Sequence, residues 1–209
     1  MLPTGGHSGK GMAIDSQGNA WITNTMGPGL DLEVKLKLLE LKVTGQMGRF
    51  HSVLFKYLND HPGLGSVSML RPDGSPAPGS PFSGGGAWGS WGVVIDGDDQ
   101  VWVSNFAGQS ITHLCGARTE TCPPGMRTGD PISPPGGYVG GGMTLLTDMG
   151  IDPAGNVWVA DNWLRPESCF EPDADEALST RCGGNGLTVF YGMAKPVRSP
   201  QIGPARALQ

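Results

Sequence analysis

A 14-residue pattern that occurs three times constrains the fold of this 209-residue chain more than any other feature. The three copies occupy residues 11–24, 92–105 and 148–161. Each copy contains Ile-Asp, then a polar turn of the Gly-Asn type, and then a tryptophan within an alternating apolar run. Such a pattern predicts a β-hairpin, with one strand that ends at Ile-Asp, a tight turn, and a second strand that carries the tryptophan.

Two further elements follow each hairpin in the same order. The first is a short β-rich run, found at residues 66–70, 110–114 and 187–190, and the second is a proline-bearing run, found at 74–77, 129–132 and 194–197. Because proline cannot donate a ladder hydrogen bond, the second run is predicted to be an outer strand. Each unit is therefore predicted to be a four-stranded antiparallel meander, and a tandem series of such units is typical of a β-propeller.

The sequence thus predicts an all-β fold, a single propeller segment over residues 1–209 with about three blades visible and a short helical insertion in the first. The expected blades span about 7–80, 87–135 and 143–200, and the insertions span 25–65 and 162–186. Both insertions join a second strand to a third strand, and this junction shares one face of a meander with the linkers between blades. Because loops carry most functional residues, this loop-rich face is the expected functional face.

The first insertion contains apolar residues at helical spacing. They are Leu32, Leu36, Leu39 and Val43, and Asp31 stands where an N-cap belongs. The spacing predicts a short helix, which either packs as a lid on the blade face or serves as a membrane-surface or partner helix. A further helical turn or two is expected between residues 51 and 58.

The repeat Gly-x-x-Ile-Asp-x-x-Gly-Asn-x-Trp-Val-x-Asn resembles the NHL-repeat propellers, in particular the bacterial branch related to the streptogramin (virginiamycin B) lyases. This group includes metal-assisted lyases, lactonase-like hydrolases and propellers that only bind proteins or sugars. In the lyases the second strand tends to end in Trp-Phe-Thr-Glu, and a magnesium ion is held near catalytic histidines. No catalytic histidine motif of that kind matches this sequence.

The resemblance also implies a ring of about six blades, within the range of four to eight that propellers span. Three recognisable units fall short of that number. The chain is therefore expected either to be part of a longer propeller or to self-associate so that copies complete the ring.

Three polar residues end the second strands on the loop-rich face, namely Asn24, Asn105 and Asp161. They are candidate ligands for a divalent metal, Mg²⁺ or Ca²⁺, and loop capping is the alternative. Another set recurs directly before each hairpin turn, namely Asp15, Asp96 and Asp152. Since aspartate hydrogen-bonds to backbone in turns, this second set is interpreted as turn caps.

Candidate catalytic residues are His51 and His61, with Asp60, in the first insertion, where a general base or metal ligand could stand. His113 falls inside a predicted strand and is interpreted as a hydrogen-bonded core residue. Four aromatic residues lie in linkers and insertions, namely Trp88, Trp91, Tyr138 and Trp163. They are candidate ligand-binding residues, and filling of the space between blades is the alternative.

The four cysteines predict two local disulfides, Cys115–Cys122 and Cys169–Cys182, with a zinc site as the competing interpretation. Disulfides belong to an oxidising compartment, so an extracellular or periplasmic location is expected. With 14 Lys and Arg against 19 Asp and Glu the net charge is −5, which argues against a nucleic acid partner. No apolar run is long enough to span a membrane.

These observations favour an exported propeller that acts as a binding module for a small molecule, glycan or protein through its loop-rich face. The alternative is a divalent-metal-assisted lyase or lactone hydrolase, and the sequence leaves open whether the protein is an enzyme.

Overall fold

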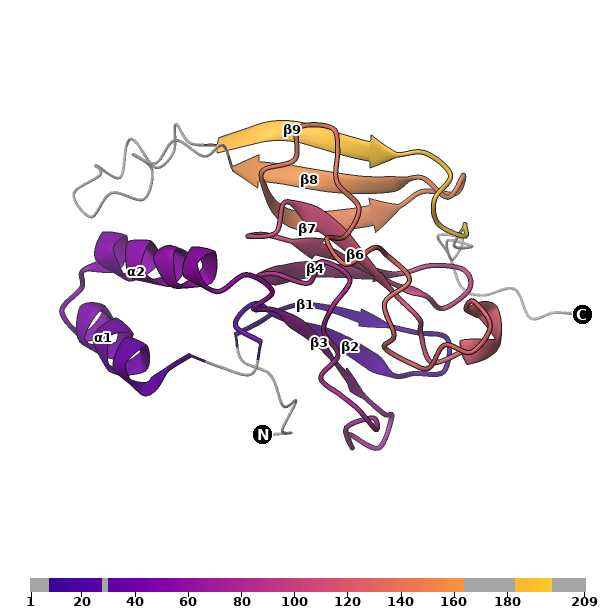
Figure 1. The fold of residues 1–209 in the computed structure, drawn as a ribbon, viewed down its shortest axis with the longest axis horizontal. Coiled ribbons are helices and arrows are strands. Elements are labelled where there is room, and N and C mark those ends of the chain that lie inside the picture. The colour runs from indigo at the N-terminus through magenta and orange to yellow at the C-terminus, as the bar shows by residue number, and fades with distance from the viewer. Residues whose placement is uncertain (1–7, 28–29, 164–182, 197–209) are drawn as a thin grey trace, which may run out of the picture.

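The computed structural model describes residues 8–27, 30–163 and 183–196, and it contains three antiparallel sheets of three strands each (Figure 1). Blade 1 consists of β1 (Gly9–Ile14), β2 (Ala20–Asn24) and β3 (Ser66–Leu70); blade 2 of β4 (Ser90–Ile95), β5 (Val101–Asn105) and β6 (Ser110–Leu114); and blade 3 of β7 (Leu145–Ile151), β8 (Val157–Trp163) and β9 (Gly183–Phe190). Within each sheet the strands pair in chain order. All three predicted hairpins are confirmed.

The first strands of the sheets form a row, because β1 lies beside β4 and β4 lies beside β7. Glycine permits this close approach. A Cβ atom at Gly11 would lie 2.6 Å from the carbonyl oxygen of Trp91, and one at Gly92 would lie 2.9 Å from that of Thr147. The three meanders extend outward from this row, which is the arrangement of consecutive propeller blades. The chain is an all-β propeller segment.

Each pair of neighbouring blades is joined by its own apolar core. Trp21 and Val67 of blade 1 pack with Val101 and other residues of blade 2. In the same way Trp102 of blade 2 packs with Val157 and other residues of blade 3. These five side chains are at most 1% exposed. The repeated tryptophan of blades 1 and 2 therefore occupies the core between blades, whereas its counterpart in blade 3, Trp158, is 39% exposed.

The predicted fourth strand of each blade does not form in the described residues, and this prediction is wrong. In blades 1 and 2 the proline-bearing run makes only isolated bridges, Leu70 with Pro76 and Leu114 with Pro131. Proline has no N–H group to extend the ladder. In blade 3 the run takes another path, since Ala194 donates to the Gly155 carbonyl in the β7–β8 turn.

The first insertion forms two helices, α1 (Leu32–Val43) and α2 (Met47–Asp60), and α2 is longer than the sequence predicts. Asp31 is the N-cap residue of α1, without a side-chain capping bond. The predicted apolar stripe is exposed, from 58% at Leu36 to 78% at Val43, and Leu38 and Leu41 are buried instead. Helix α1 packs against α2 through the opposite side from the predicted stripe, so the stripe does not form a lid contact. Within the described ranges no helix is long and apolar enough to cross a bilayer.

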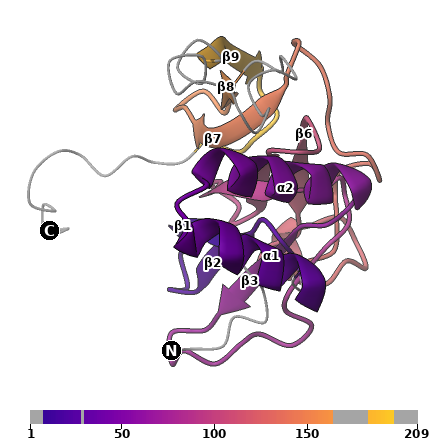
Figure 2. The ribbon, with the colours of Figure 1, turned by 90° about the vertical axis from the view of Figure 1, so that its left-hand side faces the viewer.

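The two ends of the blades differ. At one end, here called the helix end, β2 leads into α1 and α2, and the linkers between blades enter the inner strands (Figure 2). At the other end, here called the turn end, lie the tight turns of the three hairpins. The expected placement of the first insertion and the linkers on one shared face is confirmed.

Candidate functional site

The repeated aspartates cap the hairpin turns of the turn end. In blade 2 the Asp96 carboxylate accepts hydrogen bonds from the backbone N–H groups of Asp98 and Gln100 and from the indole Nε1 of Trp102. Asp15 and Asp152 make the same three kinds of contact in their own blades. The interpretation of this set as turn caps is confirmed.

The candidate metal ligands end the second strands and lie inside their blades, each at most 3% exposed. The Asn24 amide donates to the hydroxyls of Ser66 and Ser68. The Asn105 amide donates likewise within blade 2, and the Asp161 carboxylate accepts from the backbone N–H and hydroxyl of Thr144 within blade 3. Each therefore fills a structural position within its own blade. Their role as metal ligands stays a prediction, and the described part of the chain contains no group of three His, Cys, Asp or Glu that could hold a metal.

The candidate catalytic residues lie on α2 or directly after it. His61 is exposed, its Nδ1 lies 2.8 Å from the Tyr57 carbonyl oxygen, and its ring stacks on that of Tyr57. Asp60 forms an exposed ion pair with Lys56. The side chain of His51 lies outside what the structure describes. His61 and Asp60 therefore interact with their own helix, and a catalytic role stays a prediction.

His113 is a core residue, as interpreted from the sequence. Its ring stacks on the indole of Trp102 with 3.8 Å between centroids, and Nε2 lies 2.7 Å from Oε1 of Gln100. Burial lowers the pKa of this imidazole to about 4. The ring is therefore neutral at physiological pH and serves packing between blades 2 and 3.

The candidate ligand-binding aromatics also pack within the protein. Trp88 donates from Nε1 to the Leu58 carbonyl oxygen at the end of α2, at 2.7 Å. The Trp91 ring lies 4.8 Å from that of Phe106, and Tyr138 stacks on Trp102. Trp163 ends β8, but its side chain lies outside the described atoms. A ligand-binding role for these residues stays a prediction.

A small apolar recess does lie among these aromatics at the helix end. It has a volume of about 150 Å³, and its lining includes Phe55, Leu58, Trp91 and Phe106. The ammonium of Lys10 lies 4.6 Å from the centroid of the Trp91 ring at its border. A cavity of about this size accommodates one ring of benzene size. Helix α2 covers it, so the space admits a single side chain rather than an extended ligand.

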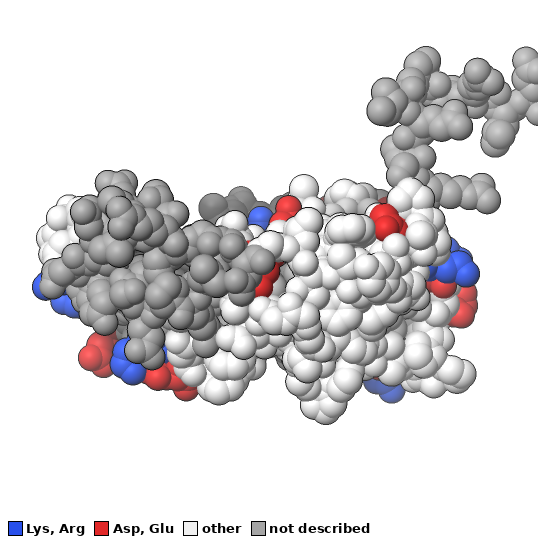
Figure 3. Space-filling model, turned by 90° about the horizontal axis from the view of Figure 1, so that it is seen from above, with Lys and Arg blue, Asp and Glu red and all other residues white. Residues whose placement is uncertain are grey.

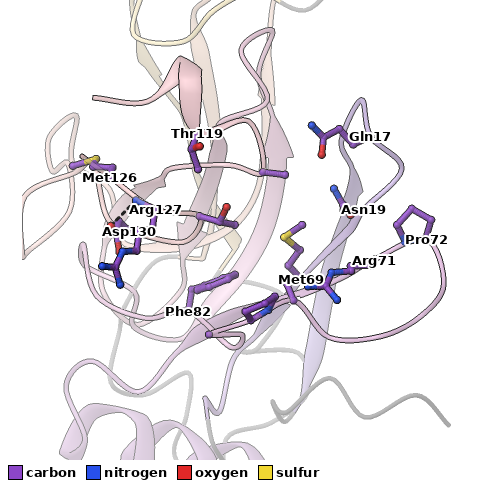
Figure 4. Close-up of a pocket in the computed structure, with 15 residues that line it drawn as sticks. Gln17, Asn19, Met69, Arg71, Pro72, Phe82, Thr119, Met126, Arg127 and Asp130 are labelled. Carbon is purple, nitrogen blue, oxygen red and sulfur yellow. Dashed lines mark hydrogen bonds between the residues drawn. The ribbon is translucent and has the colours of Figure 1, made fainter. Parts of the chain in front are cut away.

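A larger groove lies at the turn end, between the outer parts of blades 1 and 2 (Figure 4). This rim groove has a volume of about 950 Å³, within the upper part of the range usual for ligand sites. Its lining residues are Gln17, Asn19, Met69, Arg71, Pro72, Ala77, Pro78, Gly79, Phe82, Ala117, Thr119, Met126, Arg127, Thr128 and Asp130. Sequence reasoning missed this site, because the lining comes from segments far apart in the chain and from no shared motif.

One wall of the rim groove depends on a disulfide. Cys115 and Cys122 are bonded, as predicted, and they close the loop that carries Ala117 and Thr119 into the groove. Cys115 is fully buried and its backbone pairs with Gly129 and Asp130 of the same wall. The second predicted pair, Cys169–Cys182, lies outside the described residues.

Two arginines face this groove from opposite sides. Figure 4 shows Arg127 on one side, Arg71 on the other, and Phe82 and Met69 between them. Within the described part of the chain neither guanidinium forms a hydrogen bond or a close ion pair. Hydrogen bonds from Ser75 and, to a smaller extent, the charge of Arg71 nevertheless lower the pKa of the nearby Asp73 carboxyl, and the backbone N–H of Arg127 donates to Asp130 at 2.7 Å. Two arginines against one aspartate make the groove cationic in a chain of net charge −5.

No protein-family model and no curated protein matches the chain. Among solved structures, one described as a gluconolactonase is 14% identical with a TM-score of 0.43, and the match covers 87% of this chain and 48% of that one. The virginiamycin B lyase from Staphylococcus aureus is 12% identical with a TM-score of 0.38, and that match covers 93% of this chain and 44% of the lyase. The chain thus spans about half the length of these two proteins.

Proposed function

We propose that this propeller segment is a binding module whose rim groove takes an acidic peptide segment. The observation that carries the proposal is the pair of guanidinium groups, Arg71 and Arg127, on opposite walls of one groove. Neither forms a hydrogen bond or a close ion pair within the described residues. Guanidinium binds carboxylates with paired, charge-assisted hydrogen bonds. One carboxylate of the peptide would therefore bind Arg71 on one wall, and another would bind Arg127 on the opposite wall.

The floor of the groove supports a peptide rather than a small inorganic anion. Met69, Ala77 and Phe82 are each less than 9% exposed and form an apolar surface between the arginines. A peptide with apolar side chains between acidic ones matches this order of charge, apolar surface and charge. Gln17 and Thr128 line the same groove and offer amide and hydroxyl groups to the peptide backbone.

The test is fluorescence anisotropy with a labelled Glu-Leu-Glu-Leu-Glu peptide, with its Gln-Leu-Gln-Leu-Gln counterpart for comparison. The acidic peptide should bind, and binding should weaken as salt rises, because the pairs are exposed to solvent. Arg71→Gln and Arg127→Gln should each weaken binding about tenfold, the effect of losing roughly 1.4 kcal/mol of charged hydrogen bonding.

Arg49→Gln is the matched control, since Arg49 is exposed on α2 at the helix end and its side chain contacts only Gln46 among the described residues. This variant should bind like the wild type. Equal binding of the two peptides, or equal effects of all three substitutions, would refute the proposal.

The groove lies at the turn end, whereas sequence reasoning expects function at the loop-rich helix end. The difference has a physical reason: α2 and its contact with Trp88 cover part of the helix end. The alternative of a divalent-metal-assisted lyase or lactone hydrolase stays a prediction, and a turnover assay with added Mg²⁺ tests it. Membership of the NHL group and an extracellular or periplasmic location belong to the same proposal, and the disulfide is compatible with that location.

A further inference from the structure

The two interfaces between blades use the same positions of the repeat. Blades 1 and 2 each pack their back face, which carries the repeated tryptophan, on the front face of the next blade. In blade 1 the back face includes Trp21 and Val67, and in blade 2 it includes Trp102 and Ile111. All four side chains are at most 1% exposed. Burial against a following blade is therefore the normal state of a back face in this protein.

The front faces follow the same rule. In blade 2 the front face includes Val93, Val101 and Val103, and the matching positions of blade 3 are Met149, Val157 and Val159. All six side chains are at most 8% exposed. A front face is thus buried wherever a preceding blade exists.

Among the described residues, no blade covers the front face of blade 1. The repeat register matches Met12 with Val93, and Ile14 with Ile95. Met12 is 65% exposed and Ile14 is 56% exposed. Ile22, which matches Val103, is half-buried.

Likewise, no blade in the described part of the chain covers the back face of blade 3. Trp158 is 39% exposed and Leu187 is 65% exposed, although their counterparts Trp102 and Ile111 are buried. Figure 3 looks onto blade 3 from above, and the described surface seen there carries few charged side chains.

We propose that two copies of the chain associate through these two faces, so that the back face of each blade 3 packs on the front face of the partner's blade 1. Closed propellers hold about four to eight blades. Two copies supply six blades and three copies would supply nine, so two copies close the ring. The two contacts are then equivalent by a twofold axis.

The inner strands add charge complementarity to this contact. Gly92 lies against the backbone of Thr147, the position that matches Lys10 in the repeat. In blade 3 the residue that matches Gly92 is Asp148. If blade 3 meets the partner's blade 1 as blade 2 meets blade 3, Asp148 lies opposite the partner's Lys10. Because Asp148 has a side chain where glycine stands in the other blades, the proposed contact requires the inner strands to lie further apart there. The Lys10 ammonium, which lies over the Trp91 ring within one chain, would turn toward the partner's Asp148 to span that distance.

Ring closure would also complete the central channel. In one chain the channel wall encloses about 320 Å³ between the inner strands, and its lining includes Lys10, Trp91, Thr147 and Asp148. The second copy would contribute the same side chains to the other half. In the proposed dimer the partner would thus complete the channel, whereas the rim groove lies within one chain.

The test is the mass of the full chain in solution, by light scattering, for the wild type and three variants. The wild type should have twice the 21.8 kDa mass of the chain. Ile14→Lys and Leu187→Glu should each be monomeric, with dimerisation at least about 100-fold weaker because an apolar face then buries a charge. Leu36→Lys on α1 is the matched control, and it should remain dimeric.

Mixing distinguishes this contact from one between identical faces. In a mixture of the Ile14→Lys and Leu187→Glu variants, a mixed dimer has two different contacts. One contact pairs the unchanged Leu187 face with the unchanged Ile14 face, and the other pairs the introduced glutamate with the introduced lysine, so a dimer should form. Circular dichroism of each variant shows whether the fold is retained. A monomeric wild type, a large open assembly, a Leu36→Lys variant that alone dissociates, or folded variants that fail to associate on mixing would each overturn the proposal.

Discussion

The indole nitrogen of Trp102 lies 3.0 Å from Oδ2 of Asp96 and donates a hydrogen bond to it. The same carboxylate accepts two backbone N–H groups of the β4–β5 turn, and it is 4% exposed. One aspartate thus connects the turn end of blade 2 to the core between blades 2 and 3. Removal of this group should have a large effect on stability.

Asp96→Ala should lower the free energy of unfolding by about 3 kcal/mol, since several donors to a charged acceptor are left unpaired in a buried place. Urea denaturation followed by tryptophan fluorescence measures the change. Asp98→Ala, two residues away in the same turn, is the control and should change stability by less than about 0.5 kcal/mol. Equal losses in the two variants would mean that the turn, and not the carboxylate, determines the effect.

Asp152 is the counterpart in blade 3, and it titrates in an accessible range. Its hydrogen bonds from Trp158 and Asn156 lower the pKa of the carboxyl to about 2, from an ordinary value of 3.8. A lowered folded-state pKa contributes stability above pH 4 that is lost as the pH falls toward 2. The indole N–H signal of Trp158 in proton NMR should therefore shift with a midpoint near pH 2. A midpoint near 4 would contradict the role of these hydrogen bonds.

His113 should make the protein less stable in mild acid. Burial lowers the pKa of the imidazole to about 4, so the unfolded chain binds more protons than the folded chain between pH 4 and 6.5. Stability should therefore fall as the pH decreases through this range, by up to about 3 kcal/mol. Denaturation at several pH values measures the slope.

The variant His113→Met provides the comparison, because Met69 and Val189 occupy the same position in the other blades. Its stability should change less between pH 6.5 and 4 than that of the wild type. An unchanged slope would mean that other groups cause the acid sensitivity.

Loss of the Cys115–Cys122 disulfide should affect both stability and binding. Closing so short a loop is worth roughly 2 to 3 kcal/mol. The double variant Cys115→Ser and Cys122→Ser should therefore unfold at a lower urea concentration. If the loop forms a wall of the rim groove, as the structure indicates, the variant should also bind the acidic peptide more weakly. Unchanged peptide binding in a folded variant would show that this loop does not contribute to the binding site.

The hairpins and the first helix were predictable from local patterns, whereas the orientation of that helix was not. The stripe that contains Leu36 has helical spacing, but Leu38 and Leu41 on the other side are equally apolar. Only the contact of α1 with α2 determines which side is buried. Periodicity alone cannot distinguish two apolar sides of one helix.

The rim groove was not predictable, because its walls meet only after blades 1 and 2 have packed. Arg71 follows β3, while Arg127 follows the disulfide loop of the next blade. The missing fourth strands have a simpler cause. Pro76 and Pro131 indicate an edge position, but a run that contains proline forms bridges rather than a ladder.

The path of the segment from Ala194 to Pro196 has a consequence for how the repeats assemble. The backbone N–H of Lys195 donates to the Asp96 carboxylate, and its carbonyl accepts from Gly97, so this segment of blade 3 rests on the turn of blade 2. The closing segment of blade 3 is therefore held by the turn of blade 2 as well as by the β7–β8 turn of its own blade. A substitution that disrupts the Asp96 turn should thus also loosen the end of blade 3, so that one turn serves two successive repeats.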